Sequence, residues 1–177
     1  MADDAEDHVE VAVLGKKVYV KPFGYATQRN SLGIPDFLEA MFRAGCNCAV
    51  FDLADCPGMD STFLGVIAEA ATALPHRRGK HVVILNADQR AERQLRRVGL
   101  MLLVNLREEP VDLPEQLHLR EMDFVDLPRT QYQRLERIRD LHRQLVALNS
   151  GNRELFGPFL EMLDEEIQQS REAQPED

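Results

Sequence analysis

Five residues with acidic or hydroxyl side chains stand close together in one segment of the chain. In order, they are Asp52, Asp55, Asp60, Ser61 and Thr62. Such side chains can accept a phosphoryl group. They can also hydrogen-bond the start of a helix, where free backbone N–H groups and the positive end of the helix dipole favour an oxygen atom or an anion. Position alone favours Asp60 and Ser61 as helix caps, and a regulatory serine is the alternative.

The elements around this segment are expected to place it at the edge of a sheet. Residues 48–53 (CAVFDL) form a short, nearly continuous apolar run, which is typical of a strand covered on both faces. A loop with Pro57 and Gly58 follows, and a helix is expected to begin at residues 60–61. In open α/β sheets, sites form at the carboxyl ends of the strands, and this loop lies in that place.

The remainder of the N-terminal half alternates in the same way. Residues 9–20 predict a strand, a turn and a second strand, and further strands are expected at 81–85 and 102–106. Helices are expected from Pro35 to Gly45, from 60 to 75 and from 89 to 98. This order predicts an α/β fold. Its mixed sheet has mostly parallel strands after an N-terminal hairpin, right-handed crossovers and helices packed on it.

The character of the chain changes after about residue 110. Two apolar stripes at helical spacing, Leu135 to Leu148 and Phe156 to Ile167, predict a C-terminal helical hairpin with a break at 149–151. Pro158 is expected in the first turn of the second helix. The first stripe can pack back on the sheet or against a second copy of the chain, and of these we favour a homodimer.

These patterns divide the chain into five parts. They are a disordered acidic tail (1–8), the α/β domain (9–108), a linker (109–128), the helical hairpin extension (129–170) and a disordered tail (171–177).

Composition excludes several classes of function. The formal net charge is −9, whereas a nucleic-acid-binding protein needs a basic face, so we expect no nucleic-acid partner. No apolar run approaches the roughly 20 residues that span a bilayer, and the first residues are acidic, so a cytoplasmic protein without membrane contact is expected. Three cysteines, Cys46, Cys48 and Cys56, fit buried thiols better than disulfides or a metal site. We expect no metal and no cofactor.

The motifs of common enzymes are missing, which argues against catalysis. A haloacid-dehalogenase-like phosphatase needs Asp-x-Asp-x-Thr after its strand, where this chain has Asp52 and then Asp55. There is no Gly-rich phosphate loop, no His-Glu-x-x-His and no Gly-x-Ser-x-Gly. Four arginines share the helix expected at 89–98, and they indicate a solvated face or a site for an acidic partner. They are Arg90, Arg93, Arg96 and Arg97.

Residues 51–55 (FDLAD) and 59–67 (MDSTFLGVI) resemble the signature of the STAS domain, and the element order from Val9 to Leu106 extends the resemblance. Its anti-sigma factor antagonist branch implies a non-enzymatic bacterial regulator of transcription or stress signalling. In that branch, the serine matching Ser61 is phosphorylated by an anti-sigma factor, a serine kinase of the histidine-kinase-like ATPase type. The unmodified form sequesters that kinase, and a phosphatase reverses the modification. Asp52, Asp55 and Asp60 would then make the surroundings of Ser61 negative.

Two positions depart from the family pattern. Phe63 stands where family members usually have Gly, and it is expected either in the core or as an exposed partner anchor. Gly24 begins the sequence Gly-Tyr-Ala-Thr where many members have Gly-x-Leu-Asp. Thr62 is a second possible phosphoacceptor. The alternative function is a STAS scaffold or adaptor that is not phosphorylated and assembles through its C-terminal helices.

Overall fold

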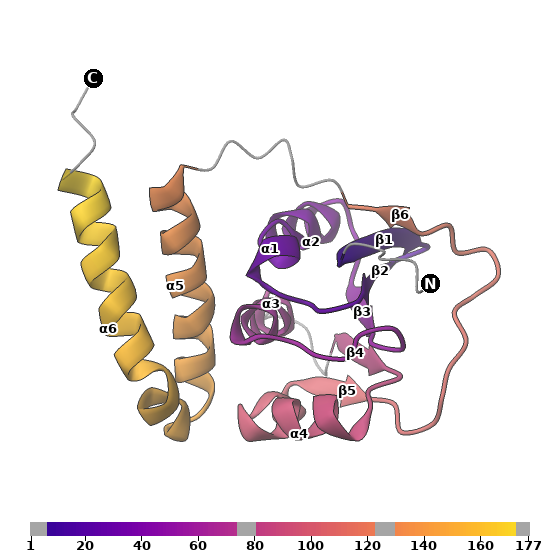
Figure 1. Ribbon diagram of the computed structural model, residues 1–177. Coiled ribbons are helices and arrows are strands. Elements are labelled where there is room, and N and C mark those ends of the chain that lie inside the picture. Colours follow the sequence, from indigo (N-terminus) through magenta and orange to yellow (C-terminus); the bar gives the residue numbers. More distant parts are fainter. Residues whose placement is uncertain (1–6, 74–80, 123–129, 173–177) are drawn as a thin grey trace, which may run out of the picture.

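The computed structural model describes residues 7–73, 81–122 and 130–172, and its centre is a six-stranded mixed sheet (Figure 1). The strand order is β5-β4-β3-β2-β1-β6. The strands are β1 (His8–Leu14), β2 (Lys17–Phe23), β3 (Cys48–Asp52), β4 (Val82–Leu85), β5 (Val104–Leu106) and β6 (Arg120–Glu121). β1 pairs antiparallel with β2, and β2 to β5 are mutually parallel. The predicted α/β fold with an opening hairpin is confirmed.

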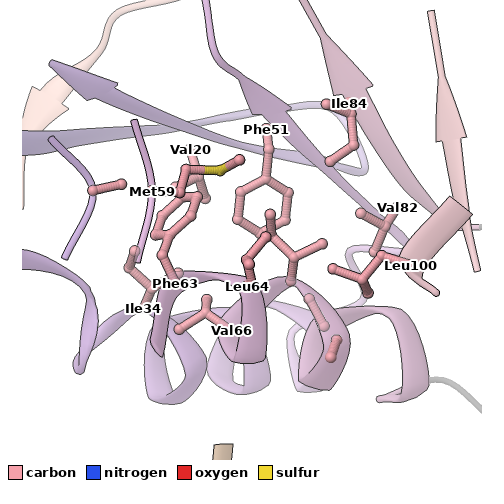
Figure 2. Packing of buried hydrophobic residues seen from close by; sticks show 14 of the residues in the cluster. Val20, Ile34, Phe51, Met59, Phe63, Leu64, Val66, Val82, Ile84 and Leu100 are labelled. Carbon is pink, nitrogen blue, oxygen red and sulfur yellow. The ribbon is translucent and has the colours of Figure 1, made fainter. Parts of the chain in front are cut away.

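One face of the sheet carries the helices. They are α1 (Gln28–Ser31), α2 (Ile34–Arg43), α3 (Ser61–Thr72), α4 (Gln89–Arg97) and a short 3₁₀ helix, η1 (Leu100–Leu102). Phe63 of α3 and Phe51 of β3 meet edge to face, with ring centroids 6.0 Å apart, and both side chains are fully buried (Figure 2). This aromatic pair anchors α3 on the sheet, so the position of the N-terminus of α3 follows from core packing.

The opposite face of the sheet is covered by irregular chain instead of helices. Tyr19, Val50 and Leu85 are buried there, and Leu113 and Leu117 pack against them. This second cover explains why β3 and β4 read as continuous apolar runs, since both of their faces are buried. The covering segment leads to β6, which extends the sheet by pairing with β1. Sequence analysis did not anticipate β6, because two exposed charged residues carry no strand pattern.

The C-terminal stripes form two long helices, α5 (Gln131–Leu148) and α6 (Gly151–Glu172), joined at residues 149–150. Thr130 and Gln133 form a capping box at the start of α5. Pro158 lies inside α6 and not in its first turn, because the helix already begins at Gly151.

α5 lies between α6 and α3 (Figure 1). Leu141 and Leu145 of its stripe are fully buried in the same core cluster as Phe63. The stripe therefore packs within the chain, on a helix that covers the sheet, and those leucines are not displayed to a second copy.

Candidate functional site

Asp60 joins the starts of two helices at the candidate site. It is the N-cap of α3, where its Oδ1 accepts a hydrogen bond from the backbone N–H of Phe63 at 2.9 Å. Its Oδ2 accepts a second bond, 2.8 Å long, from the backbone N–H of Gln28 at the first residue of α1. One carboxylate thus satisfies a free N–H group of each helix. The capping role predicted for Asp60 fits this geometry, and Ser61 is the first residue within α3.

The loop before α3 is held against the loop after β2 by backbone hydrogen bonds. Gly24 N–H donates to the carbonyl of Asp55, and Ala26 bridges to Met59 in a short parallel pairing. Gly24 has a φ of +75°, and a Cβ there would collide with the carboxylate of Asp7. The positive φ therefore favours glycine at this position, whereas the Asp7 side chain could move aside for a Cβ. These contacts fix the position of Ser61 relative to the ends of β2 and β3.

The hydroxyl of Ser61 contacts a histidine from the C-terminal hairpin. Ser61 Oγ lies 2.8 Å from Nε2 of His142 in α5, across 81 positions of the sequence. His142 is fully buried, and its ring packs against Phe156 and Phe159 of α6 with centroid distances of 5.5 and 4.7 Å. His142 thus lies where α3, α5 and α6 meet. Ser61 itself is only partly buried.

The hydrogen-bond partners of His142 define its protonation. Nδ1 lies 2.8 Å from the carbonyl oxygen of Ile138, which can only accept, so Nδ1 carries the proton. Burial lowers the pKa of His142, against the opposing effects of the Ile138 carbonyl and the charge of Asp60. The ring is therefore neutral near pH 7, and Nε2 accepts the hydrogen bond that the Ser61 hydroxyl donates.

Gly65, one helical turn after Ser61, lies directly against the backbone of α5. A Cβ at position 65 would lie 2.8 Å from both the Cβ and the carbonyl oxygen of Leu141. The backbone of α5 therefore fits against α3 only because residue 65 has no side chain. Ser61 and Gly65 together form the face of α3 that α5 covers.

The two other acidic residues of the segment belong to a separate ion cluster. Lys21 Nζ lies 3.3 Å from Oδ2 of Asp52 and 2.7 Å from Oδ2 of Asp55. Although burial of the ammonium group alone lowers its pKa, the hydrogen bonds and charges of Asp55 and Asp52 outweigh it and raise the pKa of Lys21. The surroundings of Ser61 are consequently less negative than the sequence suggests, because Lys21 pairs with two of the three carboxylates.

Asn86, at the end of β4, completes this cluster. Its Nδ2 donates to Asp52 Oδ1 at 2.7 Å, and its side chain also bonds both backbone groups of Val111. Asn86 has a φ of +55°, which asparagine tolerates better than most residues. The cluster therefore ties the carboxyl ends of β2, β3 and β4 to the segment on the opposite face of the sheet.

The remaining predicted residues lie inside the domain. Thr62 is 3% exposed, so in this conformation its hydroxyl is not offered to a partner. Phe63 occupies the core, which was the first of the two expectations for it. The three cysteines are thiols, and two of them, Cys46 and Cys56, are buried. Within residues 7–73, 81–122 and 130–172, no three His, Cys, Asp or Glu side chains are grouped as metal ligands, and no helix is long and apolar enough to cross a membrane.

Three residues of this site were not predicted from the sequence: Lys21, Asn86 and His142. A signal for Lys21 existed, since a lysine at the end of a strand next to Asp52 is well placed for an ion pair. His142 also gave a signal, because it interrupts the apolar stripe between Leu141 and Leu145. Its partner could not be read from the sequence, because nothing there places α5 on α3.

Comparison with known proteins finds similarities of structure at low sequence identity. No family model and no curated protein sequence matches the chain. The anti-sigma factor antagonist SpoIIAA in its unphosphorylated form aligns at 14% identity with a TM-score of 0.48, covering 57% of this chain and 88% of that one. The phosphorylated form of SpoIIAA from Bacillus aligns at 16% identity and TM-score 0.47, covering 57% and 92%. A proposed anti-sigma factor antagonist from Thermotoga maritima aligns at 19% identity with a TM-score of 0.49, covering 56% of this chain and 85% of that one.

Proposed function

We propose that the chain is a phosphorylation-switched, protein-binding regulator that acts as an anti-sigma factor antagonist in the bacterial cytoplasm. Ser61 is the phosphoacceptor. The partner is an anti-sigma factor that is also a serine kinase of the histidine-kinase-like ATPase type, and a phosphatase resets the switch. The proposal starts from the STAS-like signature around Ser61 and from the geometry of that residue.

One observation carries the proposal: Asp60, and not Ser61, caps α3. The cap and the bond to Gln28 both use the Asp60 carboxylate, so the hydroxyl of Ser61 is not needed to start either helix. A modified Ser61 therefore leaves the loop scaffold in place. Ser61 is also partly exposed at the edge of the domain, whereas Thr62 is buried.

The physical effect of modification is a change of charge on this edge. A phosphoserine adds about −1.5 to −2 charges at neutral pH. The backbone N–H groups at the start of α3 favour an anion, so the fold tolerates the group. Asp60 is already negative there, and an acidic partner surface would be repelled. We expect Ser61→Asp to lose partner affinity while its circular dichroism spectrum stays unchanged.

The test is intact-mass measurement and phosphosite mapping of the protein from its native cells, under growth and under stress. We expect one phosphate, on Ser61. Strains with Ser61→Ala and, as a matched control, Ser150→Ala separate the site from background, because Ser150 is an exposed serine outside α3. Absence of phosphate from Ser61 under all conditions would contradict the proposal.

A second candidate function is a scaffold or adaptor without phosphorylation. The bond from Ser61 to the buried His142 favours it, because that contact gives the serine a structural role. Assembly would then use α6, where Leu155 is 40% and Met162 50% exposed. A light-scattering mass of two or more chains, reduced to one by Met162→Lys, is the expected outcome for a scaffold.

A further inference from the structure

The α5–α6 hairpin occupies the same face of α3 that carries Ser61. Leu141 touches the α3 backbone at Gly65, and Nε2 of His142 accepts a hydrogen bond from the Ser61 hydroxyl. Arg137, one turn earlier in α5, pairs with Glu69 of α3 at 2.9 Å and with Asp36 of α2 at 3.6 Å. The hairpin therefore makes an apolar, a neutral polar and an ionic contact along one side of the domain.

We propose that the hairpin is a displaceable internal cover of the Ser61–Gly65 face, docked while Ser61 carries a free hydroxyl and displaced when Ser61 carries a phosphoryl group. The proposal rests on the proposed function only for the origin of the phosphate. It adds a second output to the switch, since phosphorylation would uncover the α3 face in addition to changing the charge beside Asp60.

The space between Ser61 and His142 is too small for a phosphoryl group. The 2.8 Å separation of Oγ and Nε2 leaves room for one hydrogen atom. Phosphorylation by a nucleoside triphosphate forms a bond from Oγ to the terminal phosphorus and breaks the bond from that phosphorus to the departing nucleoside diphosphate. The hydroxyl proton is lost to solvent. Three phosphoryl oxygens then need space beside α5, where the α3 and α5 backbones are already in contact at Gly65.

Phosphorylation also removes the hydrogen-bond donor that His142 contacts. Once Oγ is esterified, the buried Nε2 atom of a neutral His142 has no proton to accept. An unsatisfied polar atom is costly in an apolar site, and here the ring is enclosed by Phe156 and Phe159. Moving α5 away returns Nε2 to water and relieves this cost.

The charges around the junction of α3, α5 and α6 also disfavour a phosphate there. Asp60 is the charged group that acts on His142 from the α3 side, and it has the same sign as a phosphate. On the α6 side, the His142 ring contacts Phe156 and Phe159, whose apolar rings do not solvate an anion. Arg137 is engaged with Glu69 and Asp36. A phosphate on Ser61 would thus be better solvated with the hairpin displaced.

The anchors at the hairpin turn determine where displacement should be seen. Asn152 is 1% exposed and donates to the carbonyls of Val98, after α4, and of Leu145, in α5. The Leu145 carbonyl lies within about one helical turn of His142 in α5, the Val98 carbonyl lies outside α5, and neither bond involves Ser61. We therefore expect α5 to separate from α3 around Leu141 and His142 while residues 149–152 stay attached.

The test is hydrogen–deuterium exchange of the full-length chain with phosphoserine installed at position 61 by genetic-code expansion. We expect amides of α5 from Ile138 to Leu145 to exchange at least about tenfold faster than in the unmodified chain. Exchange in β2, β3 and β4 should be unchanged. The matched control carries phosphoserine at position 150, in the same hairpin but away from α3. Gly65→Ala, in which the new Cβ pushes α5 away from α3, provides the exchange pattern expected for a displaced hairpin.

Three outcomes would contradict the proposal that phosphorylation displaces the hairpin. One is unchanged exchange in α5. Another is slower exchange, which would mean that His142 becomes protonated and pairs with the phosphate. The third is equally faster exchange throughout the sheet, which would mean that the phosphate destabilises the whole domain. Because the phosphate is installed without a cellular kinase, each result stands whether or not native cells phosphorylate Ser61.

Discussion

Two polar contacts flank the start of α3, and they are built in opposite ways. The Lys21–Asp52–Asp55 cluster is ionic and comes from neighbouring parallel strands, whose register pairs Val20 with Phe51 and so brings the next residues together. The Ser61–His142 contact is neutral and joins elements 81 positions apart. The first contact holds the α/β domain together at its edge. The second contact forms only while the hairpin lies against α3. A change at Ser61 should therefore affect α5 and leave the sheet intact.

The largest effect should come from breaking the ion cluster. Lys21→Met leaves Asp52, which is 2% exposed, without its cation, and we expect a loss of about 3 kcal/mol in the free energy of unfolding. Urea denaturation measures it. The control is Lys17→Met, an exposed lysine in the same strand, which should change stability by less than about 0.5 kcal/mol. Equal effects of the two substitutions would show that the cluster does not stabilise the domain.

The contact of α3 with α5 should be broken by the smallest possible side chain. Gly65→Ala puts a Cβ 2.8 Å from the Leu141 carbonyl oxygen, and we expect a loss of about 1–3 kcal/mol in denaturation experiments. Gly157→Ala is the matched control within α6, where a Cβ meets no atom within 4 Å. It should destabilise the fold less than Gly65→Ala, because a helix-propensity gain of about 0.5–1 kcal/mol opposes the restriction that Pro158 places on the preceding residue. A stabilising Gly65→Ala would contradict the close packing.

The neutral contact should show coupling between its two residues. Ser61→Ala leaves Nε2 of His142 buried without a donor, at a cost of about 1–2 kcal/mol. Combining it with His142→Leu removes both polar partners and should cost less than the sum of the single changes. A double-mutant cycle by thermal or urea unfolding measures this coupling. Strict additivity would indicate that the two side chains do not interact in solution.

The smallest effect should be a pH dependence carried by His142. Its pKa in the folded chain lies below the ordinary value of about 6.5, so between those two values the unfolded state binds a proton that the folded state does not. This contribution is fully present above about pH 6.5. It is lost as pH falls through that window, at no more than about 1.4 kcal/mol per pH unit. His142→Leu should lack this component. Identical pH profiles for the two proteins would contradict a buried neutral histidine.

Much of the fold follows from local patterns in the sequence. The apolar runs ending at Asp52 and Leu85 identify central strands, and the Pro-Gly loop before Asp60 identifies the start of α3. Two helical stripes identify α5 and α6. What these patterns omit is the relative position of distant elements. β6 has two exposed residues, and the side of the domain that receives α5 depends on the absence of a side chain at Gly65, which only a packed structure reveals.

The candidate site divides in the same way. Asp60 was identifiable because capping chemistry is local, whereas Ser61 does not cap the helix and its role as a switch stays a prediction from the adjacent signature. The surroundings of Ser61 are less negative than predicted, because Lys21 of β2 pairs with Asp52 and Asp55. This pairing depends on β2 lying beside β3, which local sequence patterns do not show. His142 escaped identification because a histidine within an apolar stripe gives no sign of which residue it faces.

The free Ser61 hydroxyl donates a hydrogen bond to a neutral, buried His142. Long-range proton–nitrogen correlation spectra of the histidine imidazoles test this most directly, with His142→Leu used to assign the signal. We expect a neutral ring with the proton on Nδ1 and an acceptor Nε2, whose chemical shift changes in Ser61→Ala but not in Ser150→Ala. A ring that carries its proton on Nε2, that is charged at pH 7, or that is insensitive to Ser61→Ala would contradict it.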